Sequence, residues 1–77
     1  MKSYIIYRRA RDVARRIADL NEWEAANVTG TFDNAVACAD SLAADSTARG
    51  QHHSYRVFEI GKRGRPIGHC LYQAIAD

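Results

Sequence analysis

Residues 33–44 read DNAVACADSLAA, and this stretch decides the fold class of the chain. Its apolar side chains recur at a spacing that places them along one face of an α-helix. That face consists of Ala35, Val36, Ala39, Leu42 and Ala43. Asp33 is the predicted N-cap, because its carboxylate can accept hydrogen bonds from the free N–H groups of the first turn. Alanine side chains let a helix approach a neighbouring layer closely, so we expect this helix to lie tightly against a sheet.

Short runs of β-branched and aromatic residues flank this helix and predict strands. The run at residues 4–7 is apolar on both faces, which predicts a strand in the middle of a sheet. Further strands are expected at residues 28–32, 55–60 and 67–73. The last two are joined by a turn with two glycines at residues 61–64, which predicts a β-hairpin with a loop longer than two residues. Gly50 is the expected signal for the end of the helix.

Residues 9–20 are compatible with two conformations. Their apolar positions recur at helical spacing, and the segment lacks Gly and Pro, so a second helix is the favoured prediction. The apolar positions are Ala10, Val13, Ala14, Ile17 and Leu20. The alternative is a polar excursion followed by a strand around residues 13–17.

Together these elements predict a single small α+β domain over residues 1–77. We expect a mostly antiparallel sheet of three to five strands with the helix at 33–44, and a second one at 9–20 if it forms, packed on one face. The other face of the sheet is expected to be polar and to lie in solvent. A chain of this length buries about 60% of the surface that its unfolded form exposes, so it can hold one small core but no deep cleft between lobes.

Two features of the sequence predict a cytoplasmic location. No apolar run reaches the length of about 18 residues that a transmembrane helix requires. The apolar segment before Arg8 is shorter than the roughly 7–15 residues of a signal peptide. In the reducing cytoplasm, Cys38 and Cys70 are expected to be small buried hydrophobic residues rather than the two halves of a disulfide.

No motif predicts a catalytic, cofactor-binding or metal-binding site. His52 and His53 are adjacent in the chain, so their rings point apart. His69 and Cys70 face opposite sides of their strand, whereas zinc needs three or four converging ligands. Cys38 lies near the middle of the predicted helix, away from the helix N-termini and cations that make cysteines reactive. We therefore expect no enzyme activity, no cofactor and no metal.

Charge is segregated along the chain although the net charge is only +2. Residues 1–16 carry a net charge of +5, residues 17–48 carry −6 with no Lys or Arg, and residues 49–77 carry +3. Such blocks are typical of surfaces that meet charged partners, and they can equally pair with each other inside one small fold. The small net charge and the acidic block favour a protein partner over nucleic acid.

The candidate partner-binding residues are charged side chains and one tryptophan. They are Arg8, Arg11, Arg15, Glu22, Trp23, Glu24, Lys62, Arg63 and Arg65. A helix over residues 9–20 would place the first three arginines on one face. The tryptophan is either an interface anchor between two acidic side chains or a lid on the small core. The four tyrosines, which are distributed over the predicted strands, either pack within the sheet or stack on nucleic-acid bases.

The order of the elements resembles that of small anti-CRISPR proteins of phages and mobile elements. The corresponding parts are the opening strand with the sequence KSYII at residues 2–6, then residues 28–32, 33–44 and 55–72. One group of these proteins inhibits type I CRISPR–Cas systems. The resemblance implies a non-catalytic inhibitor in the cytoplasm of the host bacterium, which binds subunits of the surveillance complex Cascade and blocks its recognition of target DNA.

Two alternatives to an inhibitor remain open. One is a small prophage or bacterial protein that binds nucleic acid or regulates its use; its binding to free DNA would weaken steeply with salt. The other is a small enzyme or metalloprotein. The exposed side of a small sheet is also compatible with both a monomer and a homodimer.

Overall fold

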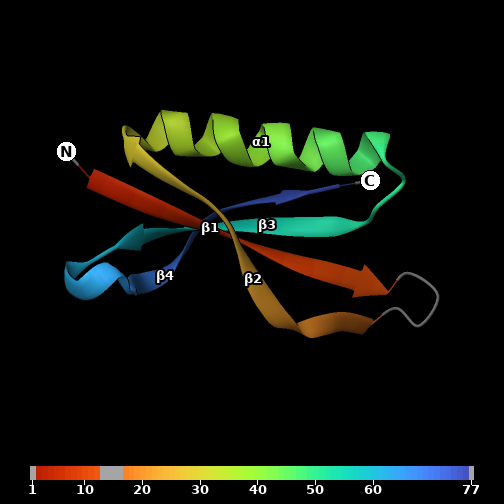
Figure 1. The fold of residues 1–77 in the computed structure, drawn as a ribbon, viewed down its shortest axis with the longest axis horizontal. Coiled ribbons are helices and arrows are strands. Elements are labelled where there is room, and N and C mark those ends of the chain that lie inside the picture. The colour runs from red at the N-terminus through yellow and green to blue at the C-terminus, as the bar shows by residue number, and fades with distance from the viewer. Residues whose placement is uncertain (1, 13–16, 77) are drawn as a thin grey trace.

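A computed structural model describes the backbone of residues 2–12 and 17–76, and the side chains of residues 2–9 and 23–76. The elements are β1 (Lys2–Asp12), β2 (Ile17–Gly30), α1 (Phe32–Ala48), β3 (His53–Ile60), a 3-10 turn η1 (Lys62–Gly64) and β4 (Pro66–Ile75). In Figure 1, α1 lies along one side of the sheet, and no helix formed by the described residues covers the opposite side. No helix in the described part of the chain is long and apolar enough to cross a membrane.

The sheet has four strands in the order β2-β1-β3-β4, and all three pairings are antiparallel. This confirms the predicted α+β class with one helix packed on a small antiparallel sheet. It also confirms that residues 4–7 lie in a central strand: Tyr4 pairs with Val28 on one side and with Glu59 on the other. A central strand has a paired strand at each edge, so its side chains on both faces are flanked by side chains of two adjacent strands. The two-sided apolar pattern of β1 is consistent with this position.

The predicted second helix over residues 9–20 is wrong. β1 continues to Asp12, β2 begins at Ile17, and these two residues pair with each other. Helical spacing over a short segment is a weak local preference, and pairing along a long hairpin overrides it because each added pair satisfies backbone groups of both strands. Residues 13–16, on which most of the alternative strand at 13–17 falls, lie outside the described residues.

The ends of α1 are set by Thr31 and Gly50. The Thr31 side chain accepts a hydrogen bond from the backbone N–H of Asn34 at 3.2 Å, so Thr31 and not Asp33 is the N-cap. The N-cap is therefore two residues earlier than predicted, and Asp33 lies in the first turn, where its negative charge interacts favourably with the helix dipole. At the other end, Gly50 has a φ of +72°, as expected of the residue that terminates a helix. Its N–H donates to the carbonyl of Thr47 at 3.0 Å.

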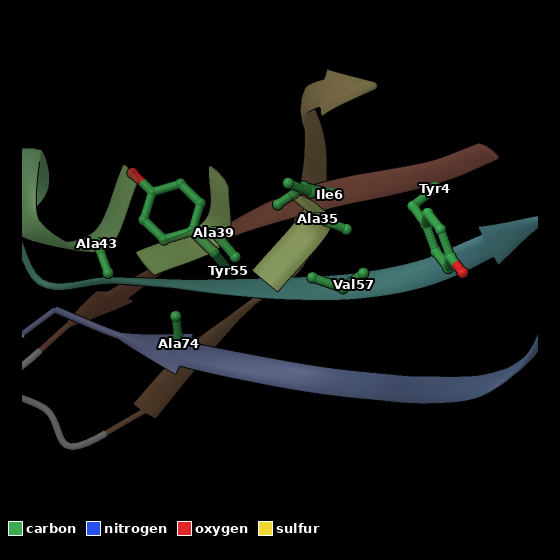
Figure 2. Packing of buried hydrophobic residues seen from close by; sticks show 8 residues of the cluster. All are labelled: Tyr4, Ile6, Ala35, Ala39, Ala43, Tyr55, Val57 and Ala74. Carbon is green, nitrogen blue, oxygen red and sulfur yellow. The ribbon is translucent and has the colours of Figure 1, made fainter. Parts of the chain in front are cut away.

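The core lies between α1 and the facing side of the sheet (Figure 2). Its members are Tyr4, Ile6, Ala35, Ala39, Ala43, Tyr55, Val57 and Ala74. The most buried row of α1 runs through its alanines at four-residue spacing, while Val36 and Leu42 are only half-buried. A row of alanines permits the closest approach to the sheet, which is why it turns inward in preference to the larger side chains.

Two smaller features complete the fold. Cys38 and Cys70 are free thiols and are half-buried, so they are less enclosed than predicted. The C-terminal segment is docked: Ala76 is 1% exposed, and its N–H donates to the carbonyl of His53 at 2.8 Å. This contact extends the β3–β4 pairing past the end of β4 and closes one edge of the core.

Candidate functional site

The side of the sheet that faces away from α1, which we call the open face, has an apolar centre. Side chains alternate along a strand, so the neighbours of the core residues in β1, β3 and β4 point to this side. Five of these side chains are apolar, and we call them the open-face cluster: Ile5, Tyr7, Phe58, Leu71 and Ile75. Ile75 lies opposite Ser54, and Gln73 separates it from Leu71 along β4. The prediction that this face is polar is therefore wrong at its centre, which combines aromatic and aliphatic groups.

The middle of the open-face cluster is closely packed. Ile5 pairs with Phe58 across β1 and β3 and is only 5% exposed, although no helix covers this side. The rings of Tyr7 and Phe58 meet edge to face with their centroids 5.7 Å apart. By contrast, Leu71 and Ile75 on the outer strand β4 are 45% and 47% exposed. The cluster thus has a self-packed centre and an exposed aliphatic margin.

A guanidinium group caps one side of this cluster. Arg56 lies on the open face next to Phe58 in the alternation of β3, and its guanidinium carbon is 5.1 Å from the centroid of the Phe58 ring. A cation over an aromatic face is attracted by the negative charge of the ring face, by about 0.5–1 kcal/mol at exposed sites. Arg56 therefore holds the Phe58 ring in place and adds positive charge to an otherwise apolar surface.

The charged residues predicted to bind a partner fall at opposite ends of β3. Arg8, Trp23 and Glu24 lie near its start, because Arg8 pairs with Tyr55 and with Trp23. The other group, Lys62, Arg63 and Arg65, lies in the turn that follows the end of β3. Arg11 and Glu22 lie in β1 and β2 with side chains outside those described, and Arg15 lies outside the described residues. The shared helical face expected for Arg8, Arg11 and Arg15 does not exist, since Arg8 and Arg11 belong to a strand.

Trp23 and Arg8 contact each other at the hairpin end of the sheet. The Arg8 guanidinium carbon lies 5.8 Å from the Trp23 ring, and Trp23 is 46% exposed. Trp23 is therefore not a lid on the core. The neighbouring Glu24 accepts a hydrogen bond from the side-chain amide of Asn27. These residues form a small exposed patch with an aromatic ring and both signs of charge.

The tyrosines do not form a common stacking surface. Tyr4 and Tyr55 are in the core, and the hydroxyl of Tyr72 donates to the carboxylate of Asp40 on α1 at 2.6 Å. That bond raises the pKa of Tyr72 above its ordinary value, because it stabilises the protonated phenol beside a carboxylate. Tyr7 lies on the opposite side of the sheet.

A polar cleft of about 250 Å³ opens between the second half of α1 and the sheet. Its lining includes Arg8, Asp45, Arg49 and, at the floor, Ser46 and Tyr55. Ser46 is 2% exposed, and its hydroxyl lies 2.5 Å from the Tyr55 hydroxyl and 3.4 Å from Nδ1 of His53. The buried Ser46 hydroxyl therefore bonds within the fold, to the Tyr55 hydroxyl and the His53 ring.

Sequence reasoning missed Ser46, Tyr55 and His53 as a connected group. Ser46 lies beyond the predicted helix at residues 33–44, although it continues the buried face three residues after Ala43. A helical projection extended by one more turn would have placed its hydroxyl toward the sheet. The partners on β3 could not be found in this way, because they depend on how the helix sits along the strand.

The pKa of His53 lies below its ordinary value of 6.5, first because burial disfavours the charged ring and then because Arg8 and His52 repel it. The unfolded chain therefore binds a proton at a higher pH than the folded protein does. We expect the free energy of unfolding to fall as the pH drops through 6.5 towards the lower folded pKa, and to be unaffected by this group above 6.5.

This pH effect can be measured by urea unfolding of the wild type and of His53→Gln between about pH 5 and 7. The His53→Gln variant should lose part of the acid-side slope, whereas His52→Gln, which removes only the smallest of the three causes, should keep most of it. An equal slope in wild type and His53→Gln would contradict the assignment.

Among the described residues, no three His, Cys, Asp or Glu side chains lie close enough together to hold a metal ion. No protein-family model matches the chain, and no curated protein or solved structure shows significant similarity to it. Inferences about function therefore start from the three surfaces described above: the open face, the patch around Trp23 and the turn between β3 and β4.

Proposed function

We propose that this chain is a non-catalytic binding protein that docks on another protein through the open face of its sheet. The observation that supports the proposal is the open-face cluster, in which Leu71 and Ile75 are nearly half exposed on the outer strand, on the same side of the sheet as the packed rings of Tyr7 and Phe58. Exposed apolar groups on one face of a sheet are typical of interaction sites, because burying them against a partner removes apolar surface from water.

The chemistry of the open face favours a protein over nucleic acid as its partner. Bases stack on aromatic ring faces, but Arg56 covers one face of the Phe58 ring, and the edge-to-face contact with Tyr7 prevents the two rings from forming parallel platforms. The exposed margin is aliphatic, and Leu71 and Ile75 offer no hydrogen bond to a base or a phosphate. Aromatic and arginine groups around an apolar patch are enriched at the centres of protein interfaces.

The partner that we propose is the Cascade complex of a type I CRISPR–Cas system, in the cytoplasm of the host bacterium. This identification comes from the resemblance of the element order to anti-CRISPR proteins, and the protein-type chemistry of the open face is compatible with it. In this proposal the chain covers a surface through which Cascade binds target DNA. It inhibits by occupying that surface and catalyses no reaction. The patch of Arg8, Trp23 and Glu24 provides a second, more polar contact.

The test uses a purified type I Cascade complex, the full chain and a labelled target duplex. Wild-type protein should reduce binding of the duplex by Cascade, and Leu71→Ser/Ile75→Ser should weaken association with Cascade by about tenfold or more, as hot-spot losses do. Ile67→Ser is the matched control, because Ile67 is also 47% exposed but lies at the start of β4 beside the turn. It should bind like the wild type.

Two results would count against the proposal in different ways. If the wild type leaves target binding by Cascade unchanged, the inhibitor function is wrong. If Cascade is inhibited but the Leu71→Ser/Ile75→Ser variant acts like the wild type, the docking surface is wrong. Light scattering of the wild type and of Leu71→Ser/Ile75→Ser tests for self-association. If the wild type is a dimer and the variant is a monomer, the open face binds a second copy of the chain.

We propose direct binding of DNA as the alternative function, because the turn between β3 and β4 has a chemistry unlike that of the open face. Lys62, Arg63 and Arg65 are all exposed there within four residues of each other. When cations of a protein neutralise DNA phosphates, the binding affinity falls as the salt concentration rises. The logarithm of the binding constant falls with the logarithm of the salt concentration, with a slope of about −0.9 for each phosphate neutralised. Fluorescence anisotropy with free duplex DNA should give a slope near −3, and an absence of binding at low salt would refute this function.

A further inference from the structure

The turn between β3 and β4 forms a narrow tip with a closed backbone. We call residues 61–65, with the sequence GKRGR, the basic tip. The N–H of Gly61 donates to the carbonyl of Arg65 at 2.8 Å and closes the turn at its base. Gly61 also lies against Ile67, since a Cβ added to Gly61 would be 2.5 Å from Cγ2 of that side chain. The basic tip is thus fixed at its base and projects beyond the sheet pairings.

The positive charge of the basic tip is not balanced by nearby carboxylates. Residues 60–76 contain no Asp or Glu. The preceding acidic residue, Glu59, is already engaged by Lys2, with the Lys2 Nζ 3.2 Å from its carboxylate oxygen. Within the described part of the chain, no carboxylate pairs with Lys62, Arg63 or Arg65. The three cations therefore present a concentrated positive field to solvent.

Arg63 occupies a backbone conformation that suits glycine. Its φ of +69° and ψ of +16° are left-handed, and it is the one non-glycine residue with positive φ among those described. Such a conformation costs free energy for any residue with a Cβ, and this kind of strain often marks functional positions. Gly64 follows with a φ of +69°, and nothing lies within 4 Å of the place where its Cβ would be. At the end of the tip, Gly64 therefore leaves the backbone between Arg63 and Arg65 exposed.

Arg65 is held in the opposite, extended conformation. Its φ is −97° and its ψ is 144°. The following Pro66 favours this geometry, because the proline ring clashes with a helical residue before it. The two guanidinium groups are consequently carried on backbones whose directions are both restricted before a ligand binds. This preorganisation lowers the entropy lost on binding.

We propose that the basic tip binds the minor groove of A·T-rich duplex DNA, with Arg63 and Arg65 entering the groove and Lys62 contacting a phosphate. The inference rests on the DNA-binding function proposed above and names its ligand. A·T tracts have a narrow minor groove with an enhanced negative potential that attracts arginine. A guanidinium is more weakly hydrated than an ammonium group, so it enters a groove at a smaller cost.

The shape of the tip favours the minor groove over the major groove. The minor groove is about 6 Å wide, and the missing side chain of Gly64 lets the backbone between the two arginines come close to its rim. A β-ribbon can also enter the major groove, but it reads bases there with polar side chains on its strands. The strand residues next to the tip are Ile60, Pro66 and Ile67, which have no side-chain group to donate to or accept from base edges.

The first experiment measures fluorescence anisotropy of the full chain with two labelled hairpin duplexes of equal length, one an A·T tract and one G·C. We expect about tenfold tighter binding to the A·T duplex at low salt, within the range of specific over mismatched sites. Netropsin, a small ligand of the A·T minor groove, should displace the protein. Equal affinity for the two duplexes, or no displacement by netropsin, would overturn the inference while leaving DNA binding itself in place. No binding to either duplex would overturn both.

The second experiment separates the groove contacts from simple charge. Arg63→Lys/Arg65→Lys keeps the charge, so it should retain binding to the G·C duplex but lose most of the A·T preference. Lys62→Ala should weaken both duplexes alike and reduce the salt slope by about one. Arg49→Ala removes an exposed cation at the C-terminal end of α1 and should change neither affinity nor preference. An A·T preference that survives the double Lys substitution would overturn the groove assignment.

The strained position of Arg63 provides a third test with two readouts. Arg63→Gly should raise the midpoint of thermal unfolding by a few degrees, about 5 °C, because glycine adopts positive φ without a steric penalty. The same variant should weaken binding to the A·T duplex several-fold. A variant that is more stable and binds the A·T duplex as well as the wild type would remove Arg63 from the site.

Discussion

Replacing Ile6 by Ala is expected to lower the free energy of unfolding by about 4 kcal/mol, towards the upper part of the usual range for such substitutions. Ile6 is 0% exposed and lies between the sheet and α1 (Figure 2). Its neighbours across the interface are Ala35 and Ala39, which belong to the same cluster. Alanine has no side-chain torsion that could swing a methyl group into the vacated space, so the cavity cannot be refilled locally.

The Ile6→Ala effect is large compared with the whole stability of a small domain. A chain of this size is stabilised by roughly 4–12 kcal/mol, so the variant should be marginally folded at room temperature. Urea unfolding should show a lower midpoint at an unchanged slope. Ile75→Ala is the control, because the same side chain is 47% exposed on the open face and should cost less than about 1 kcal/mol. Equal losses in the two variants would mean that the helix side of the sheet is not the main core.

Replacing Ala39 by Leu is expected to cost about 3 kcal/mol by the opposite mechanism. Ala39 is 0% exposed in the middle of the buried row of α1. Leucine adds three carbon atoms where helix and sheet are in contact, so either α1 moves away from β3 or the added side chain adopts a strained rotamer. Because α1 packs mainly through alanines, a shift outward also separates Ala35 and Ala43 from the sheet.

The control for Ala39→Leu is Ala44→Leu on the exposed side of α1. Leucine and alanine have similar helix propensities, so this change should alter the stability by no more than about 0.5 kcal/mol. Differential scanning calorimetry should place Ala39→Leu about 15 °C below the wild type and Ala44→Leu close to it. If Ala39→Leu unfolds at the wild-type temperature, the alanine row is not what positions the helix.

The sequence identified the main elements because each one satisfies a local rule. The alanine-rich stretch at residues 33–44 had a helical period that no competing pattern matched, and α1 spans Phe32–Ala48. The β-branched runs and the two glycines at 61–64 located β3, the turn and β4. The error at the start of α1 was small and had a local cause: Thr31 caps the helix where Asp33 was expected, and both side chains can accept hydrogen bonds from the N–H groups of a first turn. Other ends differed more, since α1 runs to Ala48 and β2 begins at Ile17.

The sequence was misleading where two patterns coexist. Residues 9–20 have apolar positions at helical spacing, yet the chain continues as β1 to Asp12 and resumes as β2 at Ile17. A short segment has little intrinsic helical stability, so the partner strand decides its conformation. The error carried over to the candidate site, because the expected arginine face depended on that helix.

The basic turn and the open face differ in the same way, since one could be predicted from local sequence and the other could not. The charge and exposure of Lys62, Arg63 and Arg65 were predictable, because a turn between two strands has no other place for its side chains. The apolar centre of the open face was not predictable, since Ile5, Phe58 and Leu71 come from three strands whose alternation had to be set by the position of α1.

By itself, the sequence determined the helix with its alanine face, the central place of residues 4–7 and the separation of charge into blocks. These features depend only on local spacing and composition, so they can be recognised without knowing which distant segments lie next to them. The tertiary structure decided that residues 9–12 and 17–20 are strands, that Ser46 meets Tyr55 and His53, and that the cations fall at opposite ends of β3. Each of these depends on the register between segments far apart in the chain, and register is set by which apolar faces can be buried together.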